Sequence, residues 1–140
     1  IGVAETDPTN DVDGWDAAIK VAALVTVLMD TPMSPQQVNP TGIRGITSEM
    51  ITKAKADGKR YKLVCTAEKV GDIVEASVAP QLVDSSSPLY GMMNSSTGLT
   101  LRTDVILDYS ITLSERPGMQ GGPVETAYGL FADFVNLAGQ

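Results

Sequence analysis

The order of strand-like and helix-like segments constrains the fold of this chain more than any other feature of its sequence. Beyond residue 59, β-branched and aromatic residues recur in segments typical of β-strands. We predict strands over residues 60–67, 72–79, 99–107 and 109–113. Because no helical pattern lies between them, neighbouring strands can pair antiparallel through turns. This order predicts an α+β fold with a largely antiparallel or mixed sheet and helices packed on one face.

Three segments have the apolar spacing of helices, and they cover residues 14–29, 49–57 and 124–137. Before the first, Asp13 stands at the N-cap position, and Asp16 occupies the capping-box position three residues later. The second half of this helix is apolar nearly all round, which predicts burial on most sides. The residues before Asp13 are rich in Gly, Asp, Asn, Pro and Thr, so we expect a structured loop there.

The length of 140 residues suits one domain spanning 1–140, and an apolar fraction of 43% is enough for a core. The chain has ten Lys and Arg residues and seventeen Asp and Glu residues, which gives a net charge of −7. So acidic a chain argues against nucleic acid and anionic membranes as partners. The charge-free run Val21–Met29 is shorter than the ~20 residues of a membrane span, and no signal peptide is evident. We expect a cytoplasmic protein, or a plastid one if the source is a plant.

The counts of His and Cys limit the chemistry. The chain has no His, which excludes Ser-His-Asp triads and His-ligated metals. Its one cysteine, Cys65, excludes an intrachain disulfide and a thiolate metal cluster, and its apolar surroundings predict a buried thiol. Catalysis can therefore draw only on carboxylates, Lys, Tyr and the backbone.

A nucleotide-binding half is not evident in this sequence. The Gly-rich turn Gly118–Gly122 lacks the G-x-G-x-x-G spacing of dinucleotide sites, and it lies near the C-terminus without a surrounding βαβ pattern. No phosphate-binding P-loop occurs either.

The densest set of reactive groups lies at the start of the chain, where five carboxylates and one lysine fall within sixteen residues. Turn formation and helix capping account for some of these acids without any function. Lys20 is different, because it follows Asp16 by four residues and so shares its helical face, at the expected edge of the core. The six residues are Glu5, Asp7, Asp11, Asp13, Asp16 and Lys20.

Two functional interpretations compete with simple capping and solvation. A calcium loop beginning at Thr9 would place Lys20 at its twelfth position, where a bidentate Glu is required, so this interpretation is weak and we expect no metal site. Alternatively, the run forms a site for a small polar metabolite. A Lys–Asp pair can then exchange a proton with a carbonyl or alcohol oxygen. Neighbouring carboxylates can hold a substrate ammonium.

The run from Gly2 to Lys20 resembles the G-[YF]-x-E-x-D-P-x-x-D-x-x-G-x-D-x-x-x-K signature of homoserine dehydrogenases, with every spacing kept. Downstream, residues 42–47 (Gly-Ile-Arg-Gly-Ile-Thr) resemble the family's GI-x-x-I-T element. Residues 117–127 resemble its closing GPGAGG-x-x-T-A turn and helix, although the Gly-rich part is one residue longer here. The resemblance thus extends over the whole chain.

The resemblance implies the catalytic and dimerisation part of an oxidoreductase, without its nucleotide-binding domain. The whole enzyme would interconvert L-homoserine and L-aspartate 4-semialdehyde with NAD or NADP, in threonine and methionine biosynthesis. Lys20 would exchange the proton and Asp16 would orient it, while Glu5 and Asp11 would hold the amino group of the substrate.

The resemblance also bears on the cofactor and on assembly. NAD or NADP would be bound mainly by the missing domain, with Gly121 and Gly122 as candidate contacts from this chain. The expected partners are a small amino-acid substrate and a second copy in a homodimer. The alternative interpretation is a non-catalytic homodimerisation or regulatory module that retains the fold.

Overall fold

The computed structural model describes residues 6–93, 96–114 and 123–139. The chain divides into two compact units, one formed by the described residues up to Gly91 and the other by those from Met92 onward. The prediction of a single domain over 1–140 stays a prediction.

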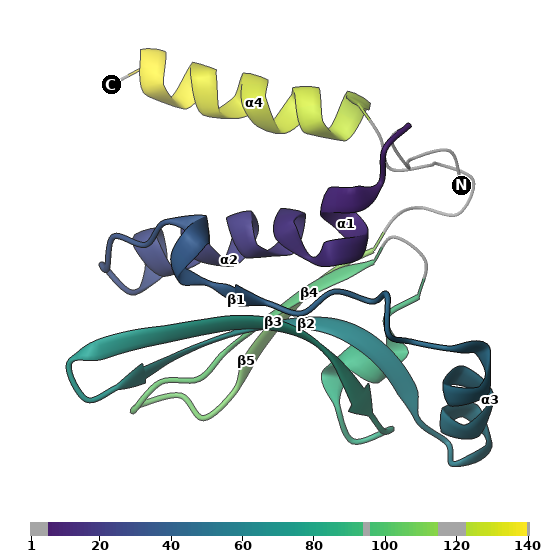
Figure 1. The fold of residues 1–140 in the computed structure, drawn as a ribbon. Helices are drawn as coiled ribbons and strands as arrows, with labels where there is room; N and C mark the ends of the chain where they lie inside the picture. The colour runs from purple at the N-terminus through teal and green to yellow at the C-terminus, as the bar shows by residue number, and fades with distance from the viewer. Residues whose placement is uncertain (1–5, 94–95, 115–122, 140) are drawn as a thin grey trace. The chain divides into compact units, whose positions relative to one another are not determined.

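The first unit combines a three-stranded sheet with helices (Figure 1). Its strand order is β1-β3-β2, with β1 parallel and β2 antiparallel to β3. This mixed α+β arrangement confirms the predicted fold class. The elements are α1 (Thr9–Asp13), α2 (Trp15–Leu28), the 3-10 turn η1 (Pro35–Gln37), β1 (Asn39–Pro40), α3 (Ser48–Ala56), β2 (Arg60–Val70), β3 (Ile73–Val83) and the 3-10 turn η2 (Pro88–Gly91).

The β2–β3 hairpin supplies two of the three strands of this sheet. Its register runs without interruption from Arg60 opposite Val83 to Val70 opposite Ile73. Gly71 closes the turn with a φ of 63°, a left-handed conformation that glycine adopts without strain. The predicted hairpin is therefore confirmed, and both strands are longer than the sequence pattern indicated.

Helix α2 lies across one face of this sheet, as Figure 1 shows. Its buried side chains are small or β-branched, which lets the helix approach the strands closely. The opposite face of α2 is exposed, and Val27 retains 77% of its accessible surface. Burial of the helix on most sides was thus a wrong prediction, because the sheet covers one of its faces and the opposite face stays exposed. The core residues are Ala18, Val21, Ala22 and Val25 of α2, with Val38, Ala76 and Val78.

The segment before α2 differs from the expected loop. Residues 9–13 form the short helix α1, and Gly14 joins it to α2 with φ 84° and ψ 10°. Gly14 is therefore the N-cap of α2, where no side chain caps the backbone. The predicted N-cap, Asp13, is instead the last residue of α1. The second predicted helix, over residues 49–57, is confirmed as α3. Thr47 caps it by accepting a hydrogen bond from the Met50 N–H at 3.3 Å.

The second unit contains a β-hairpin and a long helix. Strands β4 (Thr97–Leu101) and β5 (Tyr109–Leu113) pair antiparallel, and α4 covers Pro123–Ala138. The predicted strand 99–107 ends early at Leu101. There Arg102 forms an ion pair with Asp108 at 3.0 Å, and the Thr103 N–H donates to the Ile106 carbonyl, which turns the chain.

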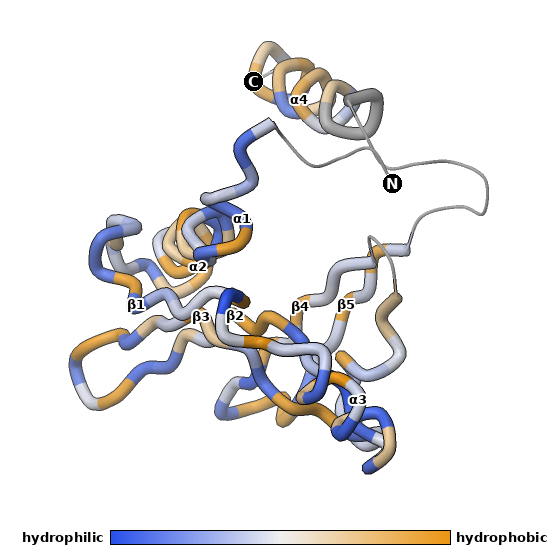
Figure 2. The backbone as a smooth tube through the Cα atoms, turned by 45° about the vertical axis from the view of Figure 1, so that its right-hand side comes forward, coloured by the Kyte–Doolittle hydropathy of each residue, from blue (hydrophilic) through white to orange (hydrophobic). Residues whose placement is uncertain are grey.

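Helix α4 is mostly apolar along its described length, as the orange tube in Figure 2 shows. Tyr128, Leu130, Phe131 and Phe134 each retain between 65% and 73% of their accessible surface. Even so, no helix in the described part of the chain is long and apolar enough to cross a bilayer.

Candidate active site

The acidic run is the segment that carries the five carboxylates and Lys20, residues 5–20. Its described part forms two helices that meet at Gly14, and we call this bend the corner. Helix α1 carries Asp11, and α2 carries Asp16 and Lys20 on the other side of Gly14. The corner starts at Asp7, whose Oδ1 accepts hydrogen bonds from the Thr9 N–H at 3.1 Å and the Thr9 hydroxyl at 2.6 Å. These bonds hold the pKa of the Asp7 carboxyl below its usual value. Asp7 therefore shapes the loop, as one expects of an Asx turn.

Asp16 and Lys20 form the predicted pair. Lys20 Nζ donates to Asp16 Oδ2 at 2.6 Å, across one helical turn. The expected placement at the edge of the core is wrong, because the Lys20 side chain is 70% exposed and that of Asp16 is 45% exposed. An exposed ammonium held by a carboxylate is accessible to a substrate that approaches this face of α2.

Cys65 of β2 lies close to this pair from the side of the sheet. Its Sγ–H points to the Ala17 carbonyl of α2 at 3.7 Å. Burial raises the pKa of the Cys65 thiol; the Lys20 ammonium partly opposes this rise, and the Asp16 carboxylate adds to it. The residue is nevertheless exposed, so the prediction of a buried thiol is wrong. The thiol is therefore neutral at neutral pH, despite its accessible surface.

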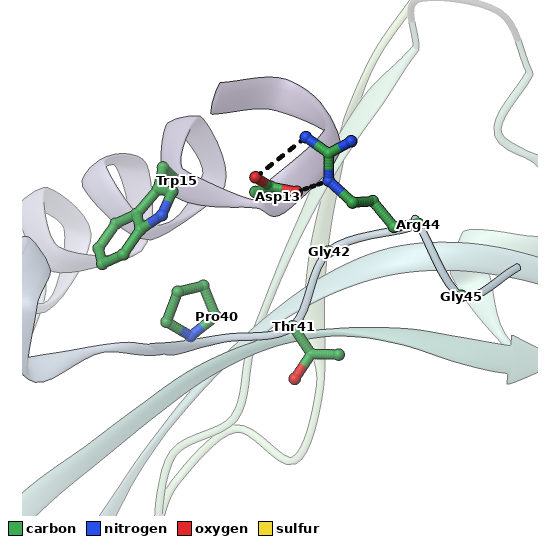
Figure 3. Close-up of a pocket in the computed structure, with 7 residues that line it drawn as sticks. All are labelled: Asp13, Trp15, Pro40, Thr41, Gly42, Arg44 and Gly45. Atoms are coloured by element: carbon green, nitrogen blue, oxygen red, sulfur yellow. Dashed lines mark hydrogen bonds and ion pairs between the residues drawn. The ribbon is translucent and has the colours of Figure 1, made fainter. Parts of the chain in front are cut away.

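A second ion pair, which no local sequence pattern predicts, ties the corner to the segment after β1. Arg44 Nε donates to Asp13 Oδ1, and Arg44 Nη2 donates to Asp13 Oδ2 at 3.1 Å (Figure 3). The hydrogen bond to this carboxylate and its charge raise the pKa of Arg44. Such a bidentate arrangement fixes orientation as well as distance.

The same segment approaches α1 through its backbone. The Ile43 N–H donates to the Val12 carbonyl at 2.8 Å. A Cβ atom on Gly42 would lie 2.1 Å from that carbonyl oxygen and 2.5 Å from the Asp13 Cα, so only glycine fits. The GI-x-x-I-T element therefore packs directly on the last turn of α1.

An open depression lies beside this contact. In Figure 3 the Trp15 ring is directed towards Pro40, while Arg44 reaches to Asp13. Neither Asp16 nor Lys20 lines the depression, so the Asp16–Lys20 pair faces another side of the corner. The lining residues are Asp13, Trp15, Pro40, Thr41, Gly42, Arg44 and Gly45.

The structure brings together only part of the predicted site. Asp16 and Lys20 are in contact, whereas Asp11 is exposed on α1 with no hydrogen bond or ion pair to either of them. Glu5, Gly121 and Gly122 lie outside the described residues. Within the described ranges, no three Cys, Asp or Glu side chains converge in a way that could hold a metal ion.

Comparison with known proteins identifies the family. The family model for Homoserine dehydrogenase matches residues 1–135. This chain belongs to the homoserine dehydrogenase family. It is 31% identical over 138 residues to an NAD(+)-dependent homoserine dehydrogenase of Pseudomonas canavaninivorans, covering 98% of this chain and 38% of that protein. A homoserine dehydrogenase of Lactococcus lactis is 32% identical over 137 residues, with 98% and 31% covered.

A solved structure of the family has the same fold. A crystal structure of the S. aureus homoserine dehydrogenase superposes with a TM-score of 0.83 and 29% sequence identity, covering 98% of this chain and 33% of that one. The chain thus spans between 31% and 38% of these three homoserine dehydrogenases. The family match includes the acidic run and the GI-x-x-I-T element, which the structure places in contact.

Proposed function

We propose that this chain is the substrate-binding and catalytic domain of a homoserine dehydrogenase. In this proposal the whole enzyme interconverts L-homoserine and L-aspartate 4-semialdehyde with NAD or NADP. The observation that carries the proposal is the exposed Asp16–Lys20 ion pair at 2.6 Å, located in the family's acidic run. An exposed Lys–Asp pair suits proton exchange with a substrate oxygen.

The residues of this chain fit the substrate better than the nucleotide. The sequence lacks a G-x-G-x-x-G turn, whereas its acidic run offers carboxylates for an ammonium group. When bound, NAD or NADP supplies the hydride acceptor or donor. In the proposal, a domain beyond this chain binds most of that cofactor, and residues 121–122 are candidates for further contacts.

Lys20 performs the proton transfer in this proposal. During oxidation of the alcohol, its neutral Nζ accepts the hydroxyl proton as the hydride leaves the carbon. During reduction of the aldehyde, its ammonium donates a proton to the carbonyl oxygen as the hydride arrives. Asp16 holds Nζ in place from 2.6 Å. Asp11 and Glu5 bind the substrate ammonium in both directions.

The proposed assembly is a homodimer that forms through the sheet of this domain. Tyr109, Ile111 and Leu113 alternate along β5 and so share one face of the hairpin. Their exposed fractions are 54%, 42% and 68%, which leaves an apolar face in contact with water. An exposed apolar face of this kind supports association with a second copy.

The proposal is tested with protein in which this chain is joined to a nucleotide-binding domain. We expect L-homoserine to drive reduction of NAD or NADP. L-2-aminobutyrate is the matched control, because it carries the same amino and carboxylate groups but has no hydroxyl to oxidise. A folded protein that reduces neither nucleotide with L-homoserine would contradict the proposal and favour a non-catalytic module.

A further inference from the structure

We infer that Arg44 is a positioning residue for the substrate site, acting through Asp13. It fixes helix α1, and with it Asp11, relative to the Asp16–Lys20 pair on α2. The inference rests on the proposed function, because it assigns to Arg44 the task of placing a carboxylate that binds the substrate. It concerns a residue outside the acidic run itself.

Helix α1 needs an external support. It is only five residues long and contains no buried residue. It joins α2 through Gly14, and a glycine, which has no Cβ atom, can adopt a wider range of backbone conformations than other residues. Without further contacts, the orientation of α1 relative to α2 would vary, and so would the distance from Asp11 to the Asp16–Lys20 pair.

The support comes from the segment that follows β1. The Thr41 N–H donates to the Val78 carbonyl at 2.6 Å, which fastens the segment to the central strand β3. Val78 itself is fully buried against α2. The next residues reach α1 through the close approach of Gly42 and the bond from Ile43 to Val12. The sheet therefore serves as a rigid reference for the position of α1.

Arg44 completes this support with a contact between two charged side chains. Its guanidinium binds both carboxylate oxygens of Asp13, the last residue of α1. The charge of Asp7, two residues before α1, also acts on the Arg44 guanidinium. The pair is too exposed, at 62% and 33%, to contribute much to stability. Its bidentate geometry instead restricts the direction of α1.

The test measures homoserine oxidation by protein in which this chain is joined to a nucleotide-binding domain. We expect Arg44→Gln to raise the KM for L-homoserine about fivefold or more. A change of this size is within the range of coupling measured between residues that share one network of contacts. We expect kcat to change far less, because Lys20 stays on α2. Asp13→Asn should have the same effect, and Arg44→Lys should restore part of the wild-type KM. Arg102→Gln is the matched control, since it breaks an exposed Arg–Asp pair elsewhere.

A double-variant cycle separates positioning from other roles. Once Asp11→Asn has removed the group that is positioned, Arg44→Gln should add little to the KM. Equal factors in both backgrounds would overturn the inference, because they would mean that Arg44 contacts the substrate directly or affects the fold in general. The charge-reversed pair Asp13→Arg with Arg44→Asp should lower the KM below that of either single variant. A KM no lower than theirs would also contradict the inference.

Failure of the inference and failure of the proposed function give different results. If the wild type oxidises L-homoserine and Asp11→Asn raises its KM, but Arg44→Gln and Asp13→Asn do not, only the positioning role is wrong. If the wild type does not oxidise L-homoserine, or Asp11→Asn leaves its KM unchanged, the proposed substrate site is wrong and the inference falls with it. Thermal unfolding of each variant shows that the comparison is between folded proteins.

Discussion

At the scale of single residues, Cys65 reports on the electrostatics of the candidate site. The pKa of its thiol is raised by burial, lowered by the Lys20 charge and raised by the Asp16 charge. We therefore predict that Lys20→Met raises this pKa further, because it removes a nearby cation that stabilises the thiolate. Asp16→Asn should lower the pKa, because it removes an anion that destabilises the thiolate. The rate of alkylation by iodoacetamide as a function of pH measures both shifts.

The two charge changes control for each other, since they must move the Cys65 titration in opposite directions. Alkylation occurs through the thiolate, so reaction of the wild-type protein should be slow at neutral pH and rise only above the ordinary thiol pKa. Identical titration curves for the wild type and both variants would mean that the Asp16–Lys20 pair does not lie next to Cys65.

Single residues also show what the sequence could and could not predict. The Asp16–Lys20 contact follows from helical spacing alone, so it was predictable. The Arg44–Asp13 pair joins residues 31 positions apart, and it depends on the path of the chain after β1. No local pattern carries that information. Asp13 resembled an N-cap only because sequence spacing did not reveal that α1 continues up to it.

At the scale of elements, the contact between residues 42–45 and α1 gives a stability prediction. Gly42→Ala should destabilise the protein by about 1–3 kcal/mol, the usual cost of overpacking, because its Cβ would lie 2.1 Å from the Val12 carbonyl oxygen. Gly45→Ala is the matched control in the same segment. Its Cβ would meet no atom within 4 Å, and its φ is not in the left-handed region.

Urea unfolding measures both glycine variants. We expect a lower midpoint for Gly42→Ala and a change within about 0.5 kcal/mol for Gly45→Ala, as for surface substitutions in general. Equal stabilities would contradict the close packing of this segment on α1, and with it the support that the Arg44 inference requires.

Elements with strong local patterns were predictable, and those that depend on distant partners were not. The β2–β3 hairpin and α3 follow from alternation, turn residues and the Thr47 cap. Strand β1 is only two residues long and exists because Asn39 and Pro40 pair with Ser77 and Val78. The early end of β4 depends on the turn that Arg102 and Asp108 close.

At the scale of the whole molecule, we predict that the chain associates into a dimer through its sheet. Leu113→Lys on the exposed apolar face of β5 should weaken this association, because a charge would have to be desolvated at the interface. Val27→Lys is the control, since it places the same charge on an exposed position of α2. Sedimentation equilibrium gives the mass of each species. A wild-type chain that stays at 14.7 kDa at high concentration would contradict the prediction.

The central claim is that Lys20 transfers the proton in homoserine oxidation, and steady-state kinetics of Lys20→Ala tests it most directly. The measurement uses protein in which this chain is joined to a nucleotide-binding domain, with Lys55→Ala on α3 as the control. We predict that Lys20→Ala lowers kcat by about 10²–10⁴-fold with a much smaller change in the KM for L-homoserine. Near-normal turnover by a folded Lys20→Ala protein would contradict the account. The Asp16–Lys20 pair would then be an exposed helical ion pair worth about 0.3–0.5 kcal/mol of stability.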